Sequence, residues 1–152
     1  MKQLQTEIKI NASPAKVWEI LTHFGSYPEW NPFITKISGD LVGGRRLHVR
    51  LEIPGGKPME LKPVITRAQT NKALSWKGST WFPGLFDGEH KFRIEEMHPE
   101  KVRFVQEEVF TGLLVPLIFP RIQFGIREGF EKMNMALRDR AEADFRGEEV
   151  KE

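Results

Sequence analysis

The sequence predicts an α+β protein in which a curved antiparallel sheet of about seven strands folds around one long helix near the C-terminus. Most of the chain alternates apolar and polar residues, which is the period of strands with one buried face. Residues 121–145 follow a helical period instead, because apolar residues recur at steps of three and four: Ile122, Ile126, Phe130, Met133, Leu137 and Ala141. A single long amphipathic helix after many strands favours a sheet wrapped around it.

The first part of the chain predicts a strand and then two short helical segments. Residues 3–10 alternate as a half-buried strand does. Ser13 is suited to an N-cap and Pro14 to the first turn, which predicts a short helix over 14–22. The aromatic stretch 24–33 contains two prolines, so one or two helical turns with irregular joints are expected there.

Six further runs alternate in the manner of strands, and glycine-containing turns separate several of them. The runs cover 34–38, 47–53, 59–65, 74–77, 90–95 and 102–110. Pro63 is expected at a bulge or an edge, because it has no N–H to donate to a neighbouring strand. We expect residues 1–146 to form one domain, and the charged tail 147–152 to be frayed.

The composition argues against several classes of function. The 152 residues, 39% hydrophobic and 29% charged, are typical of a soluble globular domain. The absence of cysteine excludes disulfides and thiol chemistry, and with only four histidines we expect no metal site and no cofactor. A net charge of +2 gives no reason to expect nucleic-acid binding. Without a membrane-span-length apolar run or a signal-peptide core, we expect a cytoplasmic protein with no stable membrane insertion.

Three motifs lie in an order that resembles the START/Bet v 1-like (SRPBCC) superfamily, in particular its polyketide cyclase/dehydrase-like branch. They are ASPAKVW at 12–18, YPEWNPF at 27–33 and EVFTG at 108–112, ahead of the last helix. The resemblance implies a helix-grip fold with an apolar cavity between the sheet and the C-terminal helix. It also implies binding of hydrophobic molecules such as lipids, sterols or polyketides. No catalytic residue set is common to the superfamily, so the resemblance assigns no catalytic role.

Three polar residues are expected on the inner face of the last two strands. Arg103 would be costly inside, so the even-numbered residues of its strand, Gln106 and Glu108 among them, should face inward. If Met97 pairs with Lys101 across the turn, His90 lies opposite Glu108 and Phe92 opposite Gln106. Glu108 and His90 are then candidates for ligand contact or for acid–base chemistry. A structural hydrogen bond near the cavity mouth is the alternative.

Large apolar residues are expected to line the cavity or to close it. The segment around Trp30 and Phe33 either lines the cavity or plugs one end of the fold, the second reading being favoured. The run 112–120 is expected as a lid or cavity wall, with a homodimer contact second, and the turn 79–86 as a second wall of the mouth. The expected lining is Trp30, Phe33, Trp76, Trp81, Phe86, Phe92, Phe104, Phe110, Leu114, Phe119, Ile126 and Phe130, with the polar His90, Gln106 and Glu108.

We therefore expect a protein that binds a hydrophobic or amphipathic small molecule. The large aromatic content, with eleven Phe and four Trp against one Tyr, suits an apolar interior or pocket. An enzyme of the cyclase, dehydrase or hydrolase kind that uses the same cavity is the alternative. A protein-interaction module resembling co-chaperone relatives is the second alternative.

Overall fold

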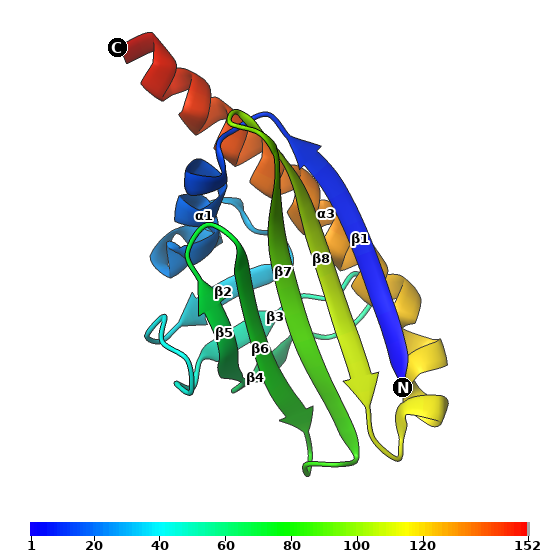
Figure 1. The fold of residues 1–152 in the computed structure, drawn as a ribbon. Coiled ribbons are helices and arrows are strands. Elements are labelled where there is room, and N and C mark those ends of the chain that lie inside the picture. Colours follow the sequence, from blue (N-terminus) through cyan, green and yellow to red (C-terminus); the bar gives the residue numbers. More distant parts are fainter. Residues whose placement is uncertain (152) are drawn as a thin grey trace.

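A computed structural model describes the backbone of residues 1–151 and the side chains of residues 1–147. It confirms the predicted architecture, an antiparallel sheet wrapped around a long C-terminal helix with short helices after the first strand (Figure 1). The strands within the described residues are β1 (Lys2–Ile10), β2 (Ile34–Ser38), β3 (His48–Leu51), β4 (Met59–Leu61), β5 (Val64–Gln69), β6 (Ala73–Thr80), β7 (Phe86–His98) and β8 (Lys101–Thr111). The helices are α1 (Pro14–Thr22), a 3₁₀ turn (Phe24–Ser26), α2 (Tyr27–Trp30) and α3 (Val115–Lys151).

The strands form two antiparallel sheets that meet at one edge. The larger sheet has the order β1-β8-β7-β6-β5, and the smaller has the order β2-β3-β4. An isolated bridge between Arg46 and Val64 joins them, and the backbone N–H of Leu47 donates to the carbonyl of Pro63 at 2.7 Å. The expected run 59–65 is divided, because Pro63 cannot donate to a neighbouring strand. The described chain therefore has eight strands where about seven were expected.

Helix α3 lies along the concave side of the larger sheet (Figure 1). Its apolar face is buried as predicted, with Ile126 7% exposed and Phe130, Met133 and Leu137 fully buried. Phe124, on the opposite face of the same helix, is largely exposed. The three-and-four spacing therefore identified the helix face that the sheet covers.

Helix α3 begins earlier in the chain than the sequence indicated. It begins at Val115 instead of Arg121, so the apolar run expected as a lid is partly the first turns of the helix. Pro116 lies in the first turn, where a backbone N–H would have no intrahelical acceptor, so it costs the helix no hydrogen bond. Pro120 lies further inside the helix and removes one hydrogen bond. The helical backbone continues to Lys151, whereas the side chains of 148–152, and with them the expected fraying, lie outside the described residues.

Side-chain hydrogen bonds fix the short helices that follow β1. The amide of Lys16 donates to Ser13 Oγ at 3.1 Å, which confirms the predicted N-cap. Asn31 Oδ1 accepts from the amides of Phe33 and Ile34 at 2.9 and 2.8 Å and so turns the chain into β2. The hydroxyl of Tyr27 donates to the carbonyl of Leu21, and burial raises the pKa of Tyr27, so this phenol stays neutral. Within residues 1–151, no helix combines the length and apolar character needed to cross a membrane.

Gly129 permits α3 to pack directly on the aromatic ring of Phe33, the residue before β2. A Cβ atom at Gly129 would lie 2.3 Å from Cδ1 of Phe33. The Phe33 ring also meets the Phe130 ring edge-on, with centroids 5.6 Å apart. The absence of a side chain at Gly129 therefore allows the Phe33 ring to lie directly against α3.

Gly129→Ala is expected to destabilise the protein by a net amount of up to about 2 kcal/mol. Overpacking a core costs about 1–3 kcal/mol, and the higher helix propensity of alanine offsets about 1 kcal/mol of that cost. Urea denaturation measures the difference, and Gly147→Ala is the matched control in the same helix, because nothing lies within 4 Å of a Cβ there. An unchanged or higher stability of Gly129→Ala would show that the Phe33 ring can move aside without a cost in stability.

Candidate functional site

The three predicted polar residues meet on the inner face of β7 and β8. His90 pairs with Glu108 and Phe92 with Gln106 across these strands, as predicted. His90 Nδ1 lies 3.1 Å from Glu108 Oε1, and His90 Nε2 lies 2.8 Å from Gln106 Oε1. His90 and Gln106 are buried, whereas the Glu108 side chain is 19% exposed. The histidine therefore connects a partly accessible carboxyl group to a fully buried amide.

The turn that sets this register differs from the one expected. Lys101 pairs with His98 rather than with Met97, so only Pro99 and Glu100 lie in the turn. That shorter turn alone would slip the strands by one residue. A bulge between Glu96 and His98 restores the register, leaving Met97 half exposed.

Two residues that the sequence analysis did not identify extend the polar chain through the core. Gln106 Nε2 donates to Asn134 Oδ1 of α3 at 2.8 Å, and Asn134 Nδ2 donates to Thr6 Oγ1 of β1 at 2.9 Å. Both new residues are buried. Thr6 occupies an inward position of the predicted strand, and Asn134 directly follows a core methionine on the helix. An amide placed next to that buried face was the signal that could have revealed the connection.

Backbone carbonyls fix the direction of every hydrogen bond in this chain. The carbonyl of Gln106 can only accept, so Thr6 donates to it at 3.4 Å. The carbonyl of Phe130 likewise lies 3.4 Å from Gln106 Nε2 and orients that amide. Gln106 Oε1 therefore faces His90, and both ring nitrogens of His90 lie against oxygen atoms. The hydrogen bond to Gln106 needs the proton on Nε2, and Nδ1 then lies 3.1 Å from the Glu108 carboxyl group, within ion-pair distance.

A small cavity of about 60 Å³ lies beside this pair, between the three-stranded sheet and strands β6–β8. Its walls are mostly apolar, and the polar part of the lining includes Glu108, the His90 ring, Ser79 and Thr80. Gly88 leaves room for the carboxyl group, since a Cβ there would lie 2.4 Å from Glu108 Oε2. The lining residues are Val49, Leu51, Leu61, Pro63, Trp76, Gly78, Ser79, Thr80, Phe86, Gly88, His90 and Glu108.

This cavity differs in position and size from the one that the resemblance implied. Small-molecule sites usually have about 300–1,000 Å³, and one was expected between the sheet and the long helix, whereas no residue of α3 lines the space described above. Aromatic rings fill the region against α3 instead: the Phe130 ring lies 4.9 Å from His90 and the Phe92 ring 5.9 Å from Phe104, centroid to centroid. Of the expected lining, Trp76, Phe86, His90 and Glu108 are at the cavity. The residues placed elsewhere, in the core or at its rim, are Trp30, Phe33, Trp81, Phe92, Phe104, Gln106, Phe110, Leu114, Phe119, Ile126 and Phe130.

The turn between β6 and β7 lies against the beginning of α3, so the two apolar segments form one end of the molecule (Figure 1). The amide of Leu113 donates to the carbonyl of Gly84 at 3.0 Å, and that of Leu114 to Leu85 at 2.9 Å. Trp81 and Leu113 do not close the cavity but stand exposed at 64% and 81%. This end is therefore an apolar rim adjoining the cavity wall formed by Ser79, Thr80 and Phe86.

The described side chains place no three or more His, Cys, Asp or Glu residues together in an arrangement that could hold a metal ion. Glu108 and His90 can exchange hydrogen bonds and protons with a molecule placed next to the apolar walls.

Comparison with known proteins gives a family and a set of structural relatives. Residues 1–142 match the family described as "Polyketide cyclase / dehydrase and lipid transport". A search of curated proteins gives no match. A START superfamily protein from Mycobacterium smegmatis is similar in structure, with a TM-score of 0.72, 20% identity, and coverage of 93% of this chain and 97% of that one.

Two enzymes are also among the structural relatives. The Zhui aromatase/cyclase from Streptomyces sp. R1128 has a TM-score of 0.73 at 12% identity, with 93% of each chain covered. Norcoclaurine synthase from Thalictrum flavum has a TM-score of 0.70 at 16% identity, with coverage of 92% of this chain and 93% of that one. At these sequence identities the structural similarity establishes the fold only. The chemistry of the site has to be argued from the residues of this chain.

Proposed function

The chain belongs to the polyketide cyclase/dehydrase and lipid transport family, and on that premise we propose that it binds an amphipathic small molecule between its two sheets. The observation that carries the proposal is the cavity, in which apolar walls meet the adjacent polar side chains of Glu108 and His90. Trp76, Phe86 and Leu51 offer an apolar surface to the body of a ligand. Glu108 and His90 offer hydrogen bonds to its polar end.

Binding requires the cavity to enlarge, because a volume of about 60 Å³ is well below that of a small-molecule site. The three-stranded sheet is the wall best suited to move. Backbone hydrogen bonds join it to the larger sheet at one end, where residues 44–47 meet Pro63 and Ile65. Leu51 and Leu61, which face the cavity, are only partly buried. Displacement of β3 and β4 would open the cavity without disturbing the packed rings against α3.

The polar end of the ligand is expected to carry a hydrogen-bond donor, such as a hydroxyl group. Glu108 Oε1 is held by His90, while no hydrogen bond is made to Oε2 by the described part of the chain. Oε2 lies beside Gly88, whose missing side chain leaves that oxygen open to the cavity. A hydroxyl group placed there would donate a hydrogen bond to this carboxyl oxygen.

Glu108→Gln is expected to weaken binding of 2-naphthol about three- to tenfold, the loss of one hydrogen bond to a carboxyl group. Naphthalene has the same apolar body without the hydroxyl, so its affinity should be nearly unchanged. Displacement of the neutral fluorescent probe N-phenyl-1-naphthylamine measures both. Glu131→Gln, on the exposed face of α3, is the control of equal charge change. Equal weakening of both ligands would make Glu108 purely structural, and no displacement of the probe by either would overturn the proposed function.

An acid–base enzyme using the same cavity is a second candidate, favoured by the 3.1 Å contact between His90 Nδ1 and Glu108 Oε1 at the cavity wall. Such a pair can give a proton to a substrate oxygen and take one back from a neighbouring carbon. Native mass spectrometry of the protein from its source, before and after incubation, separates the candidates. A bound molecule of constant mass supports binding alone. A mass change that Glu108→Gln abolishes supports catalysis.

A further inference from the structure

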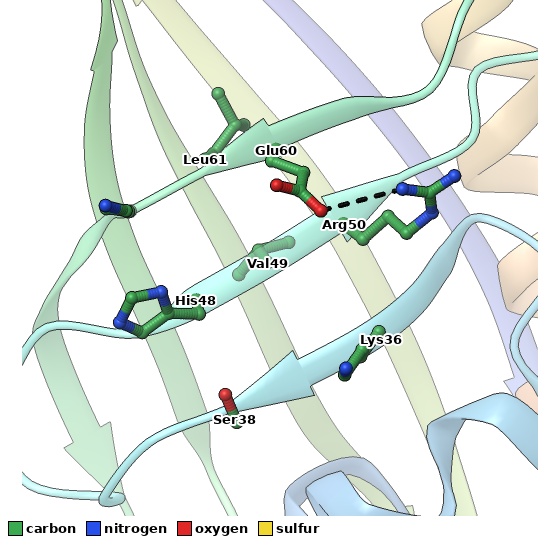
Figure 2. Close-up of a pocket in the computed structure, with 8 residues that line it drawn as sticks. Lys36, Ser38, His48, Val49, Arg50, Glu60 and Leu61 are labelled. Carbon is green, nitrogen blue, oxygen red and sulfur yellow. Dashed lines mark ion pairs between the residues drawn. The ribbon is translucent and has the colours of Figure 1, made fainter.

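The outer face of the three-stranded sheet carries a groove on the side away from the cavity. Its volume is about 280 Å³ (Figure 2). Strand alternation explains its lining: Val49 points inward and is 4% exposed, while His48 and Arg50 on either side of it point outward. Figure 2 shows the polar side chains of β2, β3 and β4 gathered over this face. The groove is lined by Lys36, Ser38, His48, Val49, Arg50, Glu60, Leu61 and Lys62.

The register of these strands places like charges side by side. Lys36 of β2 lies directly opposite Arg50 of β3, an arrangement that destabilises a sheet when no counter-charge is near. Glu60 of β4 lies opposite Arg50 on its other side, 3.6 Å away. It is the only acidic side chain of the groove lining. Among the described residues, Lys36, His48 and Lys62 have no carboxylate within ion-pair distance.

Basic residues are concentrated in this part of the chain. Residues 34–62 contain six Lys or Arg against three Asp or Glu, whereas the whole chain has 23 against 21. The remainder of the chain is therefore slightly acidic, and the excess positive charge lies with this sheet and its loops. A concave surface with an excess of positive charge attracts a negatively charged ligand.

We propose that this groove binds the phosphate group of a small soluble molecule. A phosphate carries several acceptor oxygens, so it can take paired N–H donors from the Arg50 guanidinium and a further charge from Lys36. Both side chains come from facing strand positions, so one anion between them relieves their repulsion. The site is separate from the proposed ligand cavity, because Val49 and Leu61 form the layer between the two.

The groove favours a soluble phosphate compound over a membrane surface. Its two apolar lining residues, Val49 and Leu61, are not among the largely exposed hydrophobic side chains of the described chain. The exposed aromatic residues Trp81 and Phe82 belong instead to the turn between β6 and β7. A lipid-binding face needs apolar residues that enter the bilayer beside its cations.

Titration with inorganic phosphate, followed by amide NMR shifts at low salt, tests the proposal. The amides of Lys36, Val49 and Arg50 should shift together in a saturable manner. Arg50→Gln and Lys36→Gln should each weaken binding about three- to tenfold. Lys132→Gln, which removes an exposed lysine of α3, is the matched control and should leave the affinity unchanged.

Glu60→Gln gives the opposite expectation. Removal of the carboxylate frees Arg50 and should tighten phosphate binding about two- to fivefold. Glu131→Gln changes the net charge equally on another face and should have little effect. Shifts scattered over all basic residues, or equal effects of the groove and control variants, would overturn the proposal. So would groove-dependent binding to phosphatidylserine vesicles without any binding of free phosphate.

Discussion

Replacing Phe130 with alanine is expected to lower the free energy of unfolding by about 3–5 kcal/mol. Phe130 is fully buried, and its ring contacts those of Phe33 and His90 at centroid distances of 5.6 and 4.9 Å. The space left behind is enclosed by α3 and the sheet, so neighbouring rings cannot collapse fully into it. Both the lost apolar burial and the residual void contribute to the cost.

Chemical denaturation of Phe130→Ala should be compared with that of Phe124→Ala. Phe124 lies in the same helix but is 74% exposed, so its replacement should change stability by no more than about 0.5 kcal/mol. A small loss for Phe130→Ala would indicate a solvent-filled space against α3. That result would restore the cavity position that the family resemblance implied.

Gln106→Leu is the second substitution with a large expected effect, again about 3–5 kcal/mol. Gln106 is fully buried and bonds to His90, Asn134 and the carbonyl of Phe130. Leucine would fill a similar volume but leave those buried groups unpaired, and each unpaired group costs about 1–3 kcal/mol. Gln5→Leu, on the exposed face of the neighbouring strand β1, is the control and should be nearly neutral.

A double-mutant cycle tests whether the chain from His90 to Thr6 acts as one network. Asn134→Leu removes the acceptor of Gln106 and the donor to Thr6. If the residues are coupled, the double variant Gln106→Leu/Asn134→Leu should lose at least about 1 kcal/mol less than the sum of the single losses. Additive losses would mean that the hydrogen bonds are independent and do not orient His90 together.

Much of the fold could be predicted from local periodicity. Alternation on β8 identified Gln106 and Glu108 as inward-facing, and the steps of three and four on α3 identified Phe130 and Met133 as core. The pairing of His90 with Glu108 was predicted correctly from an incorrect turn. A two-residue turn and the bulge at Met97 offset one another, and bulges have no strong signature in the sequence.

The site could be predicted less well, because its volume depends on how side chains share space. The residues expected around a large cavity fill it instead, and Phe33 reaches α3 only because Gly129 has no side chain. The start of α3 was misplaced because Pro116 and Pro120 resemble a break in the helix, although Pro116 lies in the first turn and Pro120 removes a single hydrogen bond. Asn134 was missed because the search for apolar periodicity passes over a polar residue, although it lies four residues after Phe130 and three before Leu137.

The central claim, that a ligand binds between the two sheets, is tested most directly by nuclear Overhauser effects from bound 2-naphthol. We predict contacts from the naphthyl protons to Leu51, Trp76 and Phe86, which line the cavity from both sheets. The amides of β3 and β4 should shift at the same time as this wall moves outward. Contacts confined to the exposed Trp81 and Leu113, or to the packed rings against α3, would contradict the account.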